Sequence, residues 1–463
     1  MVTFTARRST PELVAPARPT PHELKTLSDI DDSKALRYYQ PFVEFFRRRR
    51  RGPAVDAVDP AKAIRAALAE ALVHYYPMAG CLRKLPGGKL AVDCTGEGVV
   101  FVEADADVRL DELGHSVVEP PFSGREEFMC DVGDSGDVLG KPLFFLQVTR
   151  LKCGGFVTGF HTCHNMADGF GMIQFMKAIT DIAHTDQLPI VKPVWERELL
   201  MARDPPCITH MCPAYGSLLS DAPEEDGDSI TGSGDIILST PPEAFVGRFF
   251  FFTAADVAAL RAHIPKHLAK STSTFEIVTA ATWRCRTAAL GYQKTQRVRL
   301  LFTVNARARC SSGVLPIPQG YFGNALFYPL VDCTVDELCG KPLEHAVGLV
   351  HNAKVDMAEK EEQMRSMVDV MAMLRELPPV AMERTHIVSD TRWIGEENLD
   401  FGWAERVSGG IPSPMLVGSM GMSEYMMCKN ADGDDSTVVP MYLPGPAMDC
   451  FVKEIDRLLN RLE

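Results

Sequence analysis

The residues best suited to chemistry in this sequence are His164 and Asp168, which lie four positions apart and are followed by Gly169. An imidazole exchanges a proton near neutral pH, so His164 is a candidate general base. The four-residue step lets the carboxylate of Asp168 fold back under the loop, and Gly169 permits a turn that other residues resist. On local evidence alone, a structural loop histidine followed by a helix-capping aspartate is an equally good interpretation.

The flanking segments predict how this loop is held. Residues 156–160 form an apolar run typical of a buried strand, and apolar residues then recur at helical spacing from Phe170 to Ile182. The pattern predicts a strand–loop–helix unit with His164 at its rim. His161 offers no competing motif, because the residue four positions later is Asn165.

Length and composition limit the class of protein. A chain of 463 residues predicts two domains or one large two-part domain, and 46% hydrophobic with 24% charged residues is typical of a soluble globular protein. The net charge of -13 argues against a nucleic-acid surface. No apolar run reaches 18 residues and the N-terminus lacks a signal-peptide pattern, so we expect a cytoplasmic protein without membrane insertion.

The thirteen cysteines are scattered and read as reduced thiols. His161, Cys163 and His164 have no distant partner pair that would complete a zinc site, so we expect no metal.

The chain divides into two halves of similar character. Residues 1–199 form the expected N-terminal lobe, the proline-rich and acidic segment 200–240 a crossover linker, and residues 241–463 the C-terminal lobe. In the second half, Ser273 begins a capping box at the start of a helix. Free N–H groups at a helix start bind phosphate, so Ser273, Thr274 and the preceding Lys270 are candidate coenzyme A contacts. Simple helix capping is the simpler interpretation for each of them.

A second motif makes the chain recognisable. Asp400-Phe401-Gly402-Trp403 resembles the DFGWG motif of the plant BAHD family of coenzyme A-dependent acyltransferases, and His164 to Gly169 resembles that family's HxxxDG. Ala404 stands where the family usually has glycine. Supporting similarities, in the family's order, are found at residues 75–80, 153–155, 321–324 and 443–444.

The resemblance implies an α/β fold of two chloramphenicol-acetyltransferase-like lobes, with mixed sheets flanked by helices. A strand near 405–420 is expected to return to the first lobe. The resemblance also implies a monomer with a channel between the lobes and the catalytic histidine at mid-channel. A coenzyme A thioester enters from one side as co-substrate and the acceptor from the other, with no further cofactor.

The resemblance also suggests residue roles. Asp168 would hold the loop and the imidazole in place, and Asp400, Gly402 and Trp403 would be structural, with Asp400 paired to Arg307 or Arg309. Trp393 is a candidate indole N–H donor to the oxyanion, and Thr391 and Asn324 are further candidates for oxyanion or substrate contact. Transfer is expected to be direct, without an acyl-enzyme.

Three segments narrow the expected substrates. Residues 19–21, 93–98 and 388–390 resemble the alcohol acyltransferase branch, which includes benzyl alcohol benzoyltransferases and grass feruloyl-CoA monolignol transferases. We expect a hydroxycinnamoyl donor, feruloyl-CoA, and a phenylpropanoid alcohol acceptor such as a monolignol. Benzoyl or acetyl transfer to a smaller alcohol is the alternative within the class, and a catalytically idle relative that binds acyl-CoA is the alternative outside it.

Overall fold

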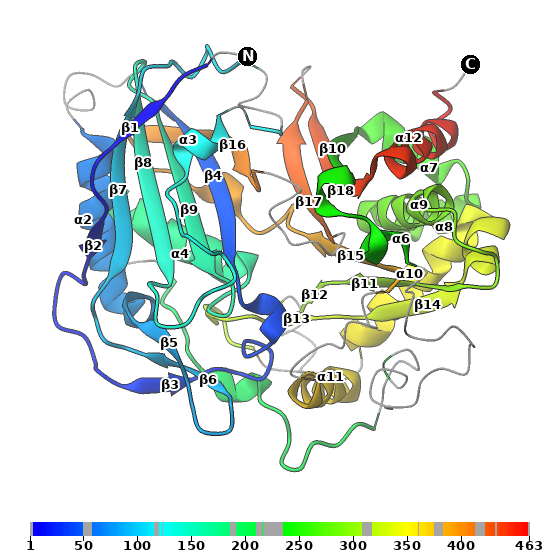
Figure 1. Ribbon diagram of the computed structural model, residues 1–463, viewed down its shortest axis with the longest axis horizontal. Helices are drawn as coiled ribbons and strands as arrows, with labels where there is room; N and C mark the ends of the chain where they lie inside the picture. The colour runs from blue at the N-terminus through cyan, green and yellow to red at the C-terminus, as the bar shows by residue number, and fades with distance from the viewer. Residues whose placement is uncertain are drawn as a thin grey trace.

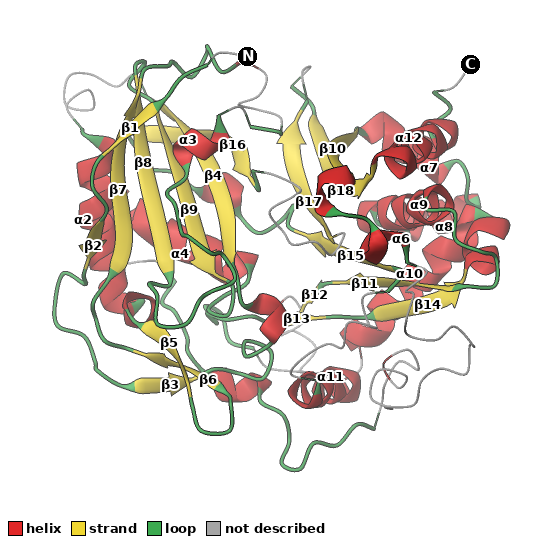
Figure 2. Ribbon diagram, viewed as in Figure 1, coloured by secondary structure: helices red, strands yellow, loops and turns green. Residues whose placement is uncertain are grey.

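A computed structural model describes residues 3–49, 58–114, 120–122, 124–185, 191–209, 215, 235–307, 317–359, 361–374, 383–412, 422–430 and 433–461. Within these residues, two large mixed sheets lie side by side and carry helices on their faces (Figures 1 and 2). The arrangement confirms the predicted α/β class with two sheet-containing lobes.

Seven of the described strands form the first sheet, in the order β1-β7-β8-β9-β4-β16, with β2 also paired to β7. Their bounds are β1 Ala6–Arg8, β2 Glu12–Val14, β4 Tyr39–Arg48, β7 Val99–Ala106, β8 Phe144–Leu151, β9 Phe156–Cys163 and β16 Ala404–Gly410. β7 and β8 are parallel, whereas β9 is antiparallel to both β8 and β4. The central strands are buried on both faces, which explains why residues 156–160 are almost continuously apolar.

Six described strands form the second sheet, in the order β10-β18-β17-β15-β11-β14. Their bounds are β10 Phe245–Phe252, β11 Arg297–Phe302, β14 Leu330–Thr334, β15 Thr385–Asp390, β17 Met422–Lys429 and β18 Asp435–Pro444. Two small sheets complete the set: β3 Leu24–Thr26, β6 Leu90–Asp93 and β5 Cys81–Lys84 form one, and β12 Val304–Asn305 with β13 Leu326–Phe327 forms the other.

Strand β16 joins the two halves. It pairs antiparallel with β4 of the first sheet, from Ala404 opposite Arg48 to Gly410 opposite Val43. The strands that precede and follow it in the sequence, β15 and β17, both belong to the second sheet. The chain therefore leaves the second sheet, adds one edge strand to the first and returns (Figure 1). Residues 413–420, within the range expected for this strand, lie outside the described residues.

Four of the described α-helices, α2, α6, α7 and α9, begin after a residue whose side chain caps them. The described α-helices are α2 Pro60–His74, α3 Arg125–Phe128, α4 Gly169–Thr185, α6 Ile236–Ser239, α7 Ala254–Arg261, α8 Lys266–Ser271, α9 Thr274–Ala289, α10 Leu343–Glu359, α11 Glu361–Met373 and α12 Gly445–Leu458. Shorter turns of 3-10 or π helix are η1 Lys34–Leu36, η2 Tyr76–Ala79, η4 Arg197–Leu200, η5 Pro242–Ala244, η7 Asp336–Gly340 and η9 Glu396–Asn398. Asp59 caps α2 by accepting from the N–H of Ala61, and Ser273 forms the predicted capping box of α9 with Glu276.

The apolar core of the first sheet contains residues from both halves of the chain. The apolar core of the first sheet includes Phe401, Trp403, Met426 and Val438, all from the second half of the chain. The methionines at 357, 364, 367 and 371 are buried in an apolar core that includes residues of α11.

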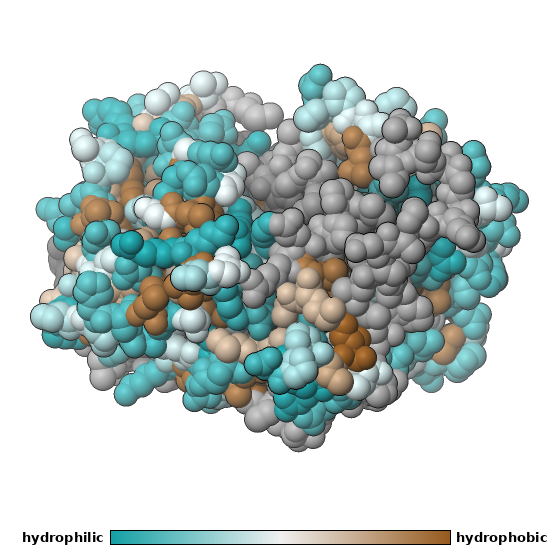
Figure 3. All heavy atoms as spheres, turned by 60° about the horizontal axis from the view of Figure 1, so that its bottom comes forward, coloured by the Kyte–Doolittle hydropathy of each residue, from teal (hydrophilic) through white to brown (hydrophobic). Residues whose placement is uncertain are grey.

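Only part of the expected linker is described, namely residues 200–209, 215 and 235–240. Arg203 in this stretch pairs with Glu362 and Asp369 of α11. On the face shown in Figure 3, hydrophilic residues cover most of the described surface, and hydrophobic residues form separate groups. None of the described helices is long and apolar enough to cross a membrane.

Candidate active site

The loop from His164 to Asp168 lies between strand β9 and helix α4, as the sequence predicts. β9 ends at Cys163, and α4 begins at Gly169. The backbone N–H of His164 donates to the carbonyl oxygen of Tyr38 at 2.9 Å, one residue before β4 begins. The end of β9 and the start of β4 thus fix the position of His164.

The His164 side chain is half-buried, and its Nδ1 is buried without a hydrogen-bond partner among the residues that the structure describes. Its ring lies 5.2 Å, centroid to centroid, from the ring of Tyr38. Burial lowers the pKa of the His164 imidazole below its ordinary value, and the nearby carboxylates of Asp168 and Asp31 oppose that shift only in part. The imidazole is therefore neutral at pH 7, the form that can accept a proton.

The Asp168 carboxylate points into the protein interior, and both of its oxygens accept hydrogen bonds. It accepts hydrogen bonds from the N–H of Gly171 at 3.0 Å, the N–H of Ala325 at 2.9 Å and Nη1 of Arg307 at 2.8 Å. Arg307 also donates to the carbonyl oxygen of Gly323. The pairing of Arg307 with Asp400 expected from the sequence is therefore wrong, because the partner of Arg307 is Asp168. Arg309, the alternative partner, lies outside the described residues.

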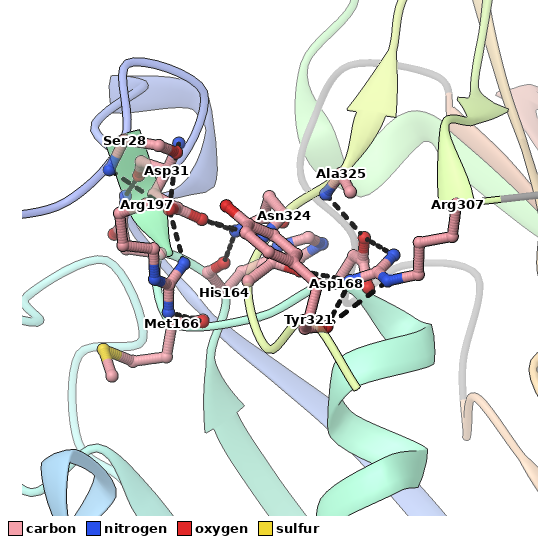
Figure 4. Close-up of polar contacts among 12 residues, drawn as sticks. Ser28, Asp31, His164, Met166, Asp168, Arg197, Arg307, Tyr321, Asn324 and Ala325 are labelled. Carbon is pink, nitrogen blue, oxygen red and sulfur yellow. Dashed lines mark hydrogen bonds and ion pairs between the residues drawn. The ribbon is translucent and has the colours of Figure 1, made fainter. Parts of the chain in front are cut away.

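Asn324 connects the second half of the chain to the histidine loop. Its Nδ2 donates to Oδ1 of Asp31 and to the carbonyl oxygen of His164, both at 2.8 Å (Figure 4). Both amide protons are thus committed to protein acceptors, which leaves no N–H to donate to an oxyanion. The expectation that Asn324 contacts the oxyanion does not fit this geometry, which instead makes Asn324 a positioning residue for the loop.

Two residues that the sequence did not single out complete this network. Asp31 is buried and accepts from Ser28, Asn324 and Nη1 of Arg197 (Figure 4). Arg197 is also buried, and it donates to the carbonyl oxygen of Met166 in the histidine loop. No local sequence pattern predicts these contacts, because residues 31, 166 and 197 come together only in the folded chain.

The Asp400 motif lies at the end of the first sheet and not at His164. Asp400 accepts from the N–H of Gly402 at 2.8 Å and from Nη2 of Arg49 at 2.9 Å. Burial raises the pKa of the Asp400 carboxyl, but the hydrogen bonds from Gly402 and Arg49 outweigh it, so the pKa is lowered overall. The true partner of Asp400 is therefore Arg49.

Gly402 and Trp403 complete this loop through packing. The backbone of Gly402 has a φ of +73°, and a Cβ there would lie 2.0 Å from the His184 ring. The Trp403 ring packs against Phe156 and Phe401. Ala404 is fully buried as the first residue of β16, so the position accommodates the methyl group.

Of the other two oxyanion candidates, one is committed elsewhere and the other is exposed. Thr391 donates through Oγ1 and through its N–H to the carbonyl oxygen of Tyr425. Trp393 is 65% exposed and lines a cavity together with Phe170 of α4. Among the described residues, neither side chain forms a hydrogen bond or a ring contact with His164.

That cavity has a volume of about 800 Å³ and is walled mainly by the second half of the chain. Two of the candidate coenzyme A contacts, Ser273 and Thr274, line this cavity, whereas the third, Lys270, does not and is exposed on α8. Three cationic side chains that the sequence did not single out also line it: Arg261, Lys354 and Arg392. Lys354 lies 3.5 Å from Oγ of Ser273 and 3.2 Å from a carboxylate oxygen of Glu276.

The cysteines near the loop are poorly suited to nucleophilic attack. Cys163 is fully buried, and burial raises the pKa of its thiol to about 12. Cys153 is half-buried, and its Sγ accepts from the N–H of Leu110.

The chain is similar to known proteins over almost its whole length. Residues 1–458 match the model of the Transferase family. Acyl transferase 1 of Oryza sativa subsp. japonica is 49% identical over 100% of this chain and 97% of its own. Spermidine hydroxycinnamoyltransferase 1 of the same plant is 49% identical over 95% and 97%, and benzyl alcohol O-benzoyltransferase of Nicotiana tabacum 44% identical over 99% and 94%.

Among solved structures, vinorine synthase is similar with a TM-score of 0.70 at 21% identity, over 98% of both chains. At 21% identity, this similarity shows that the two proteins share a fold. Since the family model and the plant relatives span almost the whole chain, the protein belongs to the Transferase family, the BAHD acyltransferases, and is an enzyme that takes its acyl group from a coenzyme A thioester.

Proposed function

We propose that the enzyme transfers a hydroxycinnamoyl group, feruloyl, from coenzyme A to the hydroxyl of a phenylpropanoid alcohol such as a monolignol, with His164 as general base. The observation that carries the proposal is the half-buried imidazole of His164 in a loop held from both halves of the chain. Because Nδ1 is buried, Nε2 is the ring nitrogen left to face a substrate.

In this mechanism, Nε2 of His164 accepts the hydroxyl proton as the alcohol oxygen attacks the thioester carbonyl carbon. The C–O bond forms, the carbonyl oxygen becomes an oxyanion, and collapse of the intermediate breaks the C–S bond. The proton on His164 then passes to the departing sulfur. Asp168 acts as a positioning residue, because its carboxylate faces Arg307 and two backbone N–H groups.

Direct transfer from donor to acceptor is the simplest route. The loop cysteine, Cys163, is buried with a raised pKa, so it is not poised to form an acyl-enzyme. Both substrates must then be bound at once.

The cavity lined by Ser273, Thr274 and Lys354 is the proposed site for coenzyme A. The cationic residues at its wall suit an anionic donor, although the protein as a whole carries a net charge of -13. Phe170, at the start of α4, links this cavity to the histidine loop.

An amine acceptor is the second candidate. One plant relative is named for spermidine, and in this chain a buried carboxyl group, Glu424, lies in the same region as Tyr38, the neighbour of His164. Either acceptor would use the same base.

A screen of donors against acceptors tests the proposal. Feruloyl-, benzoyl- and acetyl-CoA are each combined with coniferyl alcohol, benzyl alcohol and spermidine, and the products are identified by mass. The proposal expects the highest kcat/KM for feruloyl-CoA with coniferyl alcohol. A tenfold preference for benzoyl- or acetyl-CoA with benzyl alcohol would replace it, and binding of feruloyl-CoA without turnover of any acceptor would indicate an idle relative.

A further inference from the structure

Trp393 is 65% exposed, more than any other large hydrophobic residue in the described part of the chain. Single apolar side chains are common on protein surfaces, so exposure alone gives Trp393 no role. Its position does, because Trp393 lines the cavity proposed to hold the coenzyme A thioester. Phe252 and Phe302 line the same cavity but are at most 2% exposed and belong to the core of the second sheet. Trp393 is therefore the aromatic side chain there with the most surface left for a ligand.

The turn that carries Trp393 is fixed on both sides of the indole. The guanidinium of Arg392 is buried, pairs with Asp390 at 2.7 Å and donates to Oγ1 of Thr437 at 3.0 Å. Ile394, on the other side, is 7% exposed. The exposed indole thus stands on a backbone that two buried side chains hold in place. A preorganised aromatic surface of this kind binds a flat ligand at a small cost in conformational entropy.

Trp393 lies at the end of the cavity that adjoins the histidine loop. Phe170, which also lines the cavity, directly follows Gly169 of the HxxxDG motif. A Cβ added to Gly169 would lie 3.3 Å from Cγ2 of Ile394, the residue after Trp393. The segments that carry Phe170 and Trp393 are therefore in contact, one residue from the start of α4.

Positive charge gathers at another part of the cavity wall, around the start of α9. Arg261 donates to the carbonyl oxygen of Thr272 at 3.0 Å, and Nζ of Lys354 lies 3.5 Å from Oγ of Ser273. Both cations line the cavity and suit the phosphates of coenzyme A. A thioester bound by its phosphates there would extend its acyl group toward the histidine loop, where the reaction takes place and where Trp393 lies.

We propose that the indole of Trp393 contacts the aromatic ring of the acyl group, and that Trp393 thereby selects aromatic over aliphatic acyl donors. This role rests on the proposed binding of coenzyme A in the cavity. Two aromatic rings in offset or edge-to-face contact attract each other beyond the apolar area that they bury. An acetyl group has one methyl group and no ring, so it covers little of the indole.

Binding of four ligands, measured by isothermal titration calorimetry in the absence of acceptor, tests this role. They are feruloyl-CoA, benzoyl-CoA, acetyl-CoA and free coenzyme A. The wild type should bind the two aromatic thioesters about 10-fold more tightly than acetyl-CoA. In Trp393→Ala, the Kd of both aromatic thioesters should rise about 10-fold, whereas the Kd of acetyl-CoA and of free coenzyme A should stay within about twofold.

Two further variants serve as controls. Trp393→Phe keeps an aromatic ring and should retain most of the preference for aromatic thioesters. Met373→Ala removes another exposed apolar side chain, at the end of α11 and away from the cavity wall, and should bind all four ligands like the wild type. Because Trp393 is exposed, its variants should melt at the wild-type temperature.

Two results would overturn the role of Trp393. An equal loss of affinity for all four ligands in Trp393→Ala would mean that the indole contacts the part of coenzyme A that they share. Unchanged affinity of Trp393→Ala for the aromatic thioesters, or a wild type that binds them no more tightly than acetyl-CoA, would mean that the indole does not contact the acyl ring.

Transfer from feruloyl-CoA to coniferyl alcohol by the wild type is assayed in parallel, so that two failures can be told apart. If the binding of aromatic thioesters depends on Trp393 but no ester forms, the proposed substrates are wrong and the selection of aromatic donors stands. If the ester forms and Trp393→Ala binds feruloyl-CoA like the wild type, the proposed substrates stand and the role of Trp393 is wrong.

Discussion

His164 combines two properties that a general base needs, a neutral ring and a fixed backbone. Burial supplies the first by lowering its pKa, and the hydrogen bonds to Tyr38 and from Asn324 supply the second. A base must be unprotonated to act, so the lowered pKa extends its working range toward acid.

The pH dependence of kcat/KM follows from this shift. The pKa of His164 is lowered below its ordinary value of 6.5, so kcat/KM for coniferyl alcohol should fall toward acid with a midpoint below pH 6.5. A profile measured with feruloyl-CoA between pH 4.5 and 8 tests this. An acid limb with its midpoint above 6.5 would contradict the assigned environment of the ring.

Asp168 should matter through position and stability. Asp168→Ala leaves Arg307 and two N–H groups without their acceptor, and removal of one partner of a buried ion pair typically costs about 3–5 kcal/mol. We expect a lower melting temperature together with a reduced kcat. Asp168→Asn, which keeps one acceptor oxygen, should recover part of the stability. An unchanged melting curve with full loss of turnover would make Asp168 a direct participant.

For single residues, the sequence predicts which side chains could do chemistry better than it predicts which residues they contact. The spacing of His164 and Asp168 identified the loop, but Asp31 and Arg197 carried no recognisable pattern. Asp31 and Arg197 lie 166 positions apart in the sequence, and hydrophobic periodicity does not reveal a contact between them. The expected pairing of Asp400 with Arg307 was wrong for the same reason, because residue type alone does not show which of several arginines lies next to Asp400.

The loop of Asp400 to Ala404 shows how an element far from the chemistry can support it. It docks against Arg49 at the end of β4 and against His184 at the end of α4, and β4 and α4 both adjoin the histidine loop. The side chains of Asp400 and Arg49 are 42% and 27% exposed, so their ion pair is partly screened by water.

Asp400→Ala should therefore destabilise the protein only mildly. The exposed ion pair accounts for about 0.2–1 kcal/mol, and the lost hydrogen bond from Gly402 adds roughly 0.5–1.5 kcal/mol. Thermal melting of purified protein measures the change. A loss of 3 kcal/mol or more would mean that this loop is held more tightly than its exposure indicates.

Helices with a capping residue were easier to predict from the sequence than short strands. Asp59 before Pro60 and the Ser273 capping box both mark helix starts in the structure, because capping is a local interaction. The short strands β1, β2 and β3 were missed, since three residues are too few to show a period.

The molecule as a whole brings two halves together around one loop. Asn324 and Ala325 from the second half bond to His164 and Asp168 of the first, and β16 adds a strand of the second half to the first sheet. The division of the chain at residues 200–240 remains a prediction. The contact between Gln40 and Glu424 spans 384 positions and could not be predicted from the sequence, because it depends on how the two sheets face each other.

A shared site for donor and acceptor predicts sequential kinetics. Initial-rate lines should intersect when feruloyl-CoA and coniferyl alcohol are both varied, and no burst of coenzyme A should appear without acceptor. Cys163 is buried with a pKa of about 12, so it should remain unmodified in the intact-mass spectrum. Parallel lines together with an acylated cysteine or serine would contradict direct transfer.

The most direct test of the central claim is acceptor-dependent release of coenzyme A by the wild type and by His164→Ala. Thiol release from feruloyl-CoA is followed with and without coniferyl alcohol, and the ester is identified by mass. The wild type should release thiol only with the alcohol, and His164→Ala should be slower by about 10²–10⁴-fold with an unchanged melting temperature. A folded His164→Ala variant with near wild-type kcat would contradict His164 as the base.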